Sequence, residues 1–196
     1  MASLCSSLVI QTLCHQNSGK QVAVACLYCD FHAHKEQTTA HMLGAILKQV
    51  VSGFEHIPQE VEAAFQRSKT QLDGRELEYG EILKLLISTL GALQRSYICI
   101  DALDEFSDEH RPELFDALLQ VTQESPTTRL FLTGRPHIED EMERCPRSVR
   151  IRITPTEEDI QHYLVMRLRN DTQPRVMNED LRKEILKVIP EKVSGM

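Results

Sequence analysis

Tryptophan is absent from the sequence, and aromatic residues occupy only 5% of its 196 positions. Glycine and proline are also scarce, with eight of each scattered along the chain, which excludes collagen-like, low-complexity and intrinsically disordered proteins. No apolar run approaches the roughly 18 residues that a membrane-spanning helix needs, and the first residues lack the basic region of a signal peptide. We therefore expect a packed protein that does not enter a membrane.

Basic residues are outnumbered, because 22 lysines and arginines stand against 29 aspartates and glutamates, for a formal net charge of −7. A nucleic-acid groove needs a basic face that neutralises phosphates, so this balance argues against nucleic-acid binding. The six cysteines fall mostly in apolar stretches, and a chain of this length can bury a core without disulfides. We therefore expect a reducing, cytoplasmic environment.

Cys26 and Cys29, followed by His32 and His34, supply the residue types of a zinc site. On an extended strand, however, residues three apart point to opposite faces, and this segment has no glycine or proline that could turn the chain between the cysteines. We therefore interpret the cysteines as small buried hydrophobic residues. A zinc site is the alternative.

Hydrophobic periodicity predicts helices that alternate with short strands. Short, nearly continuous apolar runs predict strands covered on both faces at residues 22–31, 97–100 and 130–133. Apolar residues at helical spacing predict helices at residues 3–15, 38–51, 59–70, 76–93 and 111–121. Strands joined by long helical stretches form a mostly parallel sheet, so we predict an α/β fold in three layers, with helices on both faces of the sheet.

Residues 149–153 alternate strictly, with Val149, Ile151 and Ile153 on one face and two arginines on the other. This pattern predicts a half-exposed edge strand. The sequence that follows is helical, with Thr154 as the predicted N-cap of a helix over residues 155–168 and a further helix over residues 179–188. We therefore place a domain boundary near residue 154.

Three carboxylates follow the predicted strand at residues 97–100, namely Asp101, Asp104 and Glu105. In a parallel sheet, residues just after the strand ends gather at the carboxyl edge, where functional sites form. A carboxylate at a buried strand end suits Mg²⁺, and a second carboxylate nearby can orient or deprotonate an attacking water. We predict that Asp101 binds a metal ion and that Asp104 and Glu105 are catalytic. The alternative is a solvated acidic loop.

The predicted strand at residues 130–133 runs into Thr133, Gly134 and Arg135. It delivers a hydroxyl and a guanidinium to the same sheet edge as Asp101. The planar guanidinium group donates paired hydrogen bonds to phosphate oxygens. We predict that Thr133 and Arg135 bind a cofactor, whereas in the alternative interpretation Arg135 is an ion-paired residue of a turn.

In their order along the chain, these segments resemble the NACHT-type nucleoside-triphosphatase modules, and in particular the nephrocystin-3-like N-terminal domain of fungal proteins built like animal and plant immune receptors. The likeness extends to residues 27–31 and 158–163 and covers nearly the whole chain. It implies a P-loop NTPase-like fold in which residues 101–105 are the Walker B segment and residues 133–136 the sensor 1 segment. It also implies that residues 1–154 are the nucleotide-binding domain and residues 155–196 the start of a helical region.

The sequence departs from this family pattern in two places. Gly134 stands where the family usually has serine, which removes a hydroxyl and is expected to loosen the strand end. In addition, no G-x-x-x-x-G-K-[ST] phosphate loop occurs, because the Gly19-Lys20 pair lacks the upstream glycine and follows a predicted helix. Residues 1–16 resemble the helix after that loop, so we expect the first strand and the phosphate loop to be missing and both ends of the chain to be cut.

Without a phosphate loop, the backbone amides and the lysine that hold phosphates are absent, so we expect this chain alone not to hydrolyse ATP or bind it tightly. The first hypothesis is a partial nucleotide-binding module of a signalling ATPase switch. ATP and Mg²⁺ are then cofactors of the complete module, which acts on protein partners through attached domains and is compatible with oligomers. The second hypothesis is a free-standing, degenerate interaction module without enzymatic activity.

Overall fold

A three-stranded parallel sheet forms the centre of the computed structural model, which describes residues 2–17, 21–33, 37–70, 77–142, 144–145, 148–170 and 178–193. The strands are β1 (Val22–Tyr28), β2 (Arg95–Asp101) and β3 (Thr128–Leu132), in the order β1-β2-β3. In this register Tyr28 is level with Asp101. The parallel sheet predicted from the sequence is confirmed.

The end of β1 differs from the prediction, which continued the strand to residue 31. The Asp30 carboxylate accepts a hydrogen bond of 2.9 Å from the backbone N–H of His32, and η1 (Phe31–Ala33) is a 3₁₀ turn. An aspartate that bonds the backbone two residues further on forms a turn of its own. The strand therefore stops before the turn, and the prediction is wrong for its last residues.

The helices around the sheet begin and end close to their predicted positions. Thr38 caps one of them, because its hydroxyl accepts a hydrogen bond of 3.3 Å from the N–H of His41. The elements are α1 (Ala2–Asn17), α2 (Thr39–Ser52), α3 (Gln59–Thr70), α4 (Tyr79–Gly91), η2 (Leu103–Glu105), α5 (Arg111–Glu124), η3 (Pro136–Ile138) and α6 (Glu139–Met142).

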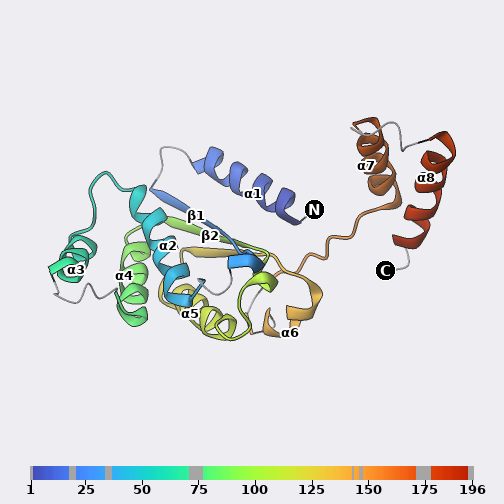
Figure 1. Cartoon of the computed structure of the whole chain (residues 1–196). Coiled ribbons are helices and arrows are strands. Elements are labelled where there is room, and N and C mark those ends of the chain that lie inside the picture. Colours follow the sequence, from blue (N-terminus) through green and yellow to red (C-terminus); the bar gives the residue numbers. More distant parts are fainter. Residues whose placement is uncertain are drawn as a thin grey trace. The chain divides into compact units, whose positions relative to one another are not determined.

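Helices cover both faces of the sheet (Figure 1). On one face α1 contacts β1 and β2, and on the other α2 contacts β1 while α5 contacts β3. The helix α4 packs against α2 and α5. The prediction of an α/β fold in three layers is confirmed.

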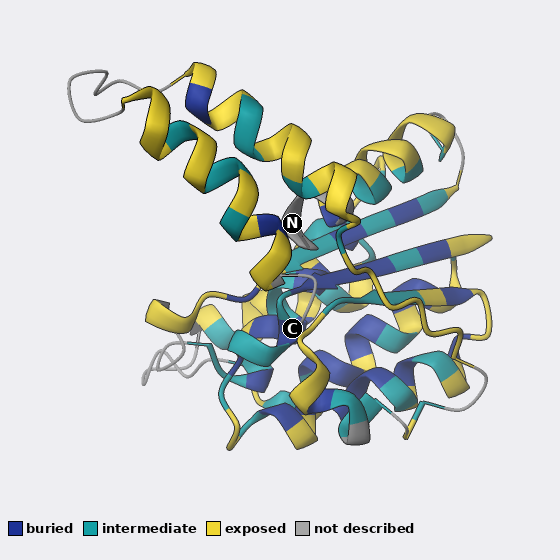
Figure 2. Ribbon diagram, turned by 90° about the vertical axis from the view of Figure 1, so that its right-hand side faces the viewer, coloured by how far each residue is buried: buried dark blue, intermediate teal, exposed yellow. Residues whose placement is uncertain are grey.

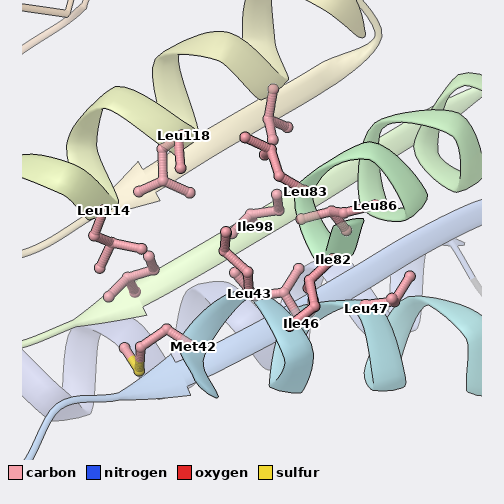
Figure 3. Packing of buried hydrophobic residues seen from close by; sticks show 14 of the residues in the cluster. Met42, Leu43, Ile46, Leu47, Ile82, Leu83, Leu86, Ile98, Leu114 and Leu118 are labelled. Atoms are coloured by element: carbon pink, nitrogen blue, oxygen red, sulfur yellow. The ribbon is translucent and has the colours of Figure 1, made fainter. Parts of the chain in front are cut away.

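The core lies between the sheet and the helices α2, α4 and α5. Figure 3 shows the buried side chains that interdigitate there, and Figure 2 shows that buried residues concentrate in the strands and in these helices. Each fully buried aliphatic side chain contributes about 1.5–3 kcal/mol to stability, so this layer supplies most of the hydrophobic driving force. Its most buried members include Leu43, Ile46, Leu86, Ile98 and Leu118.

Gln49 of α2 closes part of the outer edge of β1. Its amide oxygen accepts a hydrogen bond of 2.8 Å from the N–H of Cys26, and its amide nitrogen donates one of 2.8 Å to the carbonyl oxygen of the same residue. An edge strand presents unpaired backbone groups that attract other strands. The side chain of Gln49 therefore takes the place of a neighbouring strand at this point.

The chain divides into two compact units, Met1–Pro146 and Arg147–Met196. Residues 149–153, predicted as an edge strand, form no strand. The side chains of Val149, Ile151 and Ile153 are 86%, 80% and 62% exposed. Alternation alone does not make a strand, because a strand also needs a neighbour with backbone groups to pair with, and the described residues provide none here. The prediction of an edge strand is wrong.

The second unit contains α7 (Glu157–Arg169) and α8 (Glu179–Val193), which pack against each other and confirm the predicted helices. The N-cap of α7 is Thr156, and the prediction of Thr154 is wrong. The Thr156 hydroxyl accepts a hydrogen bond of 3.1 Å from the N–H of Asp159, and the Asp159 carboxylate accepts one of 2.9 Å from the N–H of Thr156. Both threonines precede an acidic residue by three positions, so the capping pattern alone does not choose between them.

None of the helices described here has the length and apolar character needed to span a membrane.

Candidate functional site

Asp101 ends the central strand β2 and is buried, with 2% of its surface exposed. Its Oδ1 atom accepts a hydrogen bond of 2.6 Å from the hydroxyl of Thr133 and another from the hydroxyl of Ser6 in α1. Buried charges in proteins are paired or hydrogen-bonded because an unpaired one is costly. The carboxylate therefore joins three parts of the fold, namely β2, the segment after β3, and α1.

Thr133 fixes the start of the segment that follows β3. Its N–H donates to the carbonyl oxygen of Ile100 at 3.0 Å, and its carbonyl oxygen accepts from the N–H of Leu103 at 2.9 Å. Its hydroxyl donates to Asp101 and accepts a hydrogen bond of 3.0 Å from the N–H of Ala102. Every polar group of Thr133 is thus used in holding the two segments together.

The chain turns sharply after Asp101. Ala102 adopts a left-handed backbone conformation with φ of 54°, which is uncommon for a residue with a Cβ atom. The conformation directs Asp104 and Glu105, both in η2, back toward the segment after β3. We call residues 101–105 the acidic turn.

Arg135 lies against the acidic turn. Its backbone N–H donates to Asp104 Oδ1 at 3.2 Å, its Nε atom lies 3.3 Å from Asp104 Oδ2, and its Nη2 atom lies 3.7 Å from Glu105 Oε1. The Asp104 side chain is 5% exposed, whereas the Arg135 side chain is 70% exposed. The guanidinium group is therefore ion-paired on one side and open to solvent on the other, as the turn interpretation expected.

The five predicted site residues are thus adjacent at the carboxyl edge of β2 and β3. They are Asp101, Asp104, Glu105, Thr133 and Arg135. Their predicted roles in metal binding, catalysis and cofactor binding remain predictions, because what the structure establishes is their placement.

Gly134 separates Thr133 from Arg135 in a crowded position. A Cβ atom there would lie 2.5 Å from Cδ1 and 3.1 Å from Cγ1 of Ile138, which is 1% exposed. The 2.5 Å contact is closer than Cβ atoms approach other atoms, so a side chain at position 134 would force Ile138 to shift. Packing against Ile138 therefore favours glycine, a reason that the family comparison at this position does not reveal. Both neighbours of Gly134 are hydrogen-bonded rather than loose.

Cys29 lies beside the acidic turn, and its N–H donates to the carbonyl oxygen of Asp101 at 3.0 Å. Burial, together with the negative charges of Asp101, Asp104 and Glu105, raises the pKa of the Cys29 thiol to about 12. The residue stays protonated near neutral pH, so its thiol is a poor nucleophile under those conditions.

Cys99 is also buried, and Cys26 is partly buried, in agreement with the interpretation of the cysteines as hydrophobic residues, whereas Cys14 is exposed. Within the described part of the chain, no three His, Cys, Asp or Glu side chains form a group that could hold a metal ion. His34 of the zinc alternative and the Gly19-Lys20 pair lie outside the described residues.

Sequence reasoning missed two contributors to this region, Ser6 and Arg111. Ser6 belongs to the buried side of α1, because Val9, Ile10 and Leu13 follow it at helical spacing and are partly buried. Arg111 begins α5, where the helix dipole disfavours a positive charge. An arginine at the start of a predicted helix therefore indicates that its charge is paired with residues outside that helix.

The family model for the N-terminal region of nephrocystin 3 matches residues 2–135, from the start of α1 through Arg135. The chain belongs to this family. The match ends directly after the segment that carries Thr133 and Arg135, so the family region of this chain contains all five predicted site residues.

Among solved structures, the chain is similar to the Walker-type ATPase PABY2304 of Pyrococcus abyssi, with 12% sequence identity and a TM-score of 0.43. The similarity covers 94% of this chain and 63% of that protein, so the chain spans less than two thirds of its length. No curated protein gives a significant match.

Proposed function

We propose that the carboxyl edge of β2 and β3 is the metal and phosphate end of a nucleotide-binding site, and that the chain is the partial nucleotide-binding module of a NACHT-type, NLR-like signalling ATPase of the cytoplasm. The observation that carries this proposal is the adjacency of Asp101, Thr133 and Arg135 at one sheet edge. Membership of the nephrocystin 3 N-terminal family supports it. In the complete module, ATP and Mg²⁺ would be the cofactors and attached domains would bind protein partners.

The side chains fit such cofactors chemically. Mg²⁺ prefers hard oxygen ligands and is usually held by one or two carboxylates together with phosphate oxygens and water. The Asp101 carboxylate, with the Thr133 and Ser6 hydroxyls beside it, offers oxygen donors only. When bound, Mg²⁺ would supply the positive charge that offsets the phosphates.

Arg135 would bind phosphate oxygens through its guanidinium group. Because 70% of the Arg135 side chain is exposed, its guanidinium group would offer its open side to phosphate while the other side stays paired with Asp104. Asp104 or Glu105 would be available to orient a water or accept its proton.

The sequence contains no phosphate loop, so Arg135 and the metal would provide the phosphate contacts alone. We therefore expect weak binding of Mg-ATP by the 196-residue chain and no measurable hydrolysis. Calorimetry that gave micromolar affinity would contradict this expectation.

An NMR titration with Mg-ATP tests the proposed site directly. We expect millimolar nucleotide to shift the amide signals of Thr133, Gly134 and Arg135, and we expect Arg135→Gln to abolish the shifts. The matched control is Arg129→Gln, because Arg129 lies near the start of β3, away from Arg135, and donates to the backbone carbonyl oxygens of Pro126 and Thr128. No shift at these amides, or an equal effect of both variants, would contradict the proposal.

A second test uses the chain extended by a strand and a phosphate loop before α1. There, Asp101→Ala is expected to lower Mg²⁺-dependent binding, whereas Asp104→Asn or Glu105→Gln is expected to slow hydrolysis and leave binding nearly intact. Unchanged turnover in both carboxylate variants would remove the catalytic assignment of Asp104 and Glu105.

The second candidate function is a degenerate interaction module without nucleotide. The hydrogen bonds within the site favour it, because Asp101 already accepts from two hydroxyls and Arg135 is already paired with two carboxylates. Absence of amide shifts with Mg-ATP, together with full stability of the chain, would support this candidate over the first.

A further inference from the structure

Arg111 is a buried arginine outside the predicted site, with 5% of its surface exposed. Its Nε and Nη2 atoms donate to the two carboxylate oxygens of Glu141 at 2.9 and 3.1 Å. Its Nη1 atom donates to the carbonyl oxygen of Phe106 at 3.1 Å, and Nη2 also lies 2.6 Å from the Asp108 carboxylate. All three nitrogens of the guanidinium group are therefore engaged.

The stability of α5 alone does not account for this residue. A positive charge at the first turn of a helix opposes the helix dipole, and burying a guanidinium group is costly unless it is fully paired. Hydrogen bonds with Glu141 are the main reason why the pKa of Arg111 lies above its ordinary value. The compensation for burying Arg111 thus comes from segments other than α5.

The partners of Arg111 belong to the two segments that form the predicted site. Phe106 and Asp108 directly follow the acidic turn, and Glu141 lies in α6, six residues after Arg135. The same two segments also meet where Arg135 pairs with Asp104. They are therefore joined inside the site by hydrogen bonds of Thr133 and Arg135, and beyond the site residues by the guanidinium group of Arg111.

We propose that Arg111 is a positioning residue, which sets the separation between the carboxylates of the acidic turn and Arg135 by clamping the segments that follow each of them. None of the hydrogen-bond and ion-pair partners of Arg111 given above is one of the five site residues, so Arg111 acts through Phe106, Asp108 and Glu141. We call Arg111 and these three partners the clamp. The functional part of this inference rests on the proposed nucleotide site, whereas its structural part does not.

The chain contains a matched control. Arg144 forms an ion pair with Asp116 and so also joins the segment after α6 to α5. The side chains of Arg144 and Asp116 are 45% and 59% exposed, and the pair does not include Phe106 or Asp108. Arg144→Gln therefore removes a link between α5 and the segment after α6 and leaves the hydrogen bonds of Arg111 in place.

The first experiment measures amide hydrogen exchange by NMR in the 196-residue chain. Arg111→Gln is expected to speed exchange at Leu103 and Arg135 by about tenfold or more, since it removes hydrogen bonds between charged groups. Amides in the interior of α5 and β2 are expected to keep their rates. Arg144→Gln is expected to change neither set.

Two further variants keep the test decisive. Glu141→Gln removes one charge of the clamp at a residue that is one-third exposed, so it reports on the clamp even where Arg111→Gln fails to fold. Arg111→Lys keeps the positive charge but lacks the planar fork, so we expect it to restore only part of the protection at Arg135.

The outcomes separate this inference from the proposed function. Unchanged exchange at Leu103 and Arg135, or equal acceleration throughout α5 and β2, would overturn the positioning role. Selective acceleration together with weaker Mg-ATP shifts at Arg135 would support both proposals. Selective acceleration in a chain that shows no response to Mg-ATP would support the clamp and contradict the nucleotide site.

Discussion

At the scale of single residues, the family resemblance and the packing describe the glycine at position 134 in different ways. The family resemblance describes a lost serine hydroxyl, whereas the structure shows a glycine whose missing Cβ makes room for Ile138. A side chain of any size at this position would displace a buried isoleucine. The local sequence therefore depends on a residue four positions further along the chain.

We predict that Gly134→Ala destabilises the first unit by about 1–3 kcal/mol, the usual cost of overpacking a tight core position. The reason is the distance of 2.5 Å between the new Cβ atom and Cδ1 of Ile138. Urea unfolding measures the change. Ile138→Val removes Cδ1, so Gly134→Ala should cost less in the Ile138→Val background than alone, and simple additivity of the two costs would contradict the steric explanation.

The five site residues were predictable because the rule behind them is local. A strand that ends in polar residues within a parallel sheet brings those residues to one edge, whatever the rest of the fold does. Ser6 and Arg111 were not predictable in the same way. The partner of Ser6 lies 95 residues away and Glu141, the bidentate partner of Arg111, lies 30 residues away, and only the packing of α1 and α6 brings these pairs together.

At the scale of elements, the strict alternation of residues 149–153 was misleading. The three strands of the sheet were predicted from short, nearly continuous apolar runs, and each of them pairs with a parallel neighbour. Residues 149–153 have the pattern of a strand but have no paired neighbour in the described chain. Alternating hydrophobicity shows that a segment can form a strand, but the strand forms only where its backbone pairs with a neighbouring strand.

The capping box of α7 gives the second prediction. Hydrogen bonds from the Thr156 hydroxyl and backbone lower the pKa of Asp159 below 3.8. A carboxylate with a lowered pKa in the folded state stabilises that state above its unfolded pKa, and the contribution is lost as pH falls through the folded value. The start of α7 should therefore loosen below about pH 4.

NMR titration of the Asp159 carboxyl carbon tests this prediction. The apparent pKa of Asp159 should lie below 3.8 in the unmodified chain and rise in Thr156→Ala, because the largest hydrogen bond is then removed. Thr154→Ala is the matched control, since Thr154 is not the cap, and its Asp159 should titrate as in the unmodified chain. An equal rise in both variants would contradict the assignment of the cap.

At the scale of the whole molecule, residues 148–154 are exposed along their entire length and contain neither helix nor strand. Exposed chain outside helices and strands is the preferred substrate of proteases. We predict that brief digestion with trypsin cuts first after Arg150 or Arg152, and mass spectrometry of the fragments measures it. A first cut within α5 or α7 would contradict the prediction.

The same digestion tests the division into two units. The N-terminal fragment contains the whole sheet and its core, so it should unfold in one cooperative transition with nearly the midpoint of the intact chain. Arg150→Gln combined with Arg152→Gln is the control, because it removes the cleavage sites and leaves the fold unchanged. A fragment that loses its cooperative transition would show that the units depend on each other.

Gln49 makes the two outer edges of the sheet different. Because this side chain occupies backbone groups of Cys26 on the outer edge of β1, a further strand is opposed there, whereas the outer edge of β3 has no strand against it in the described chain. Association through the edge of β3 is therefore less opposed than association through the edge of β1. Two copies that pair their β3 edges with each other leave no β3 edge for a third copy, so this mode of association ends at a pair.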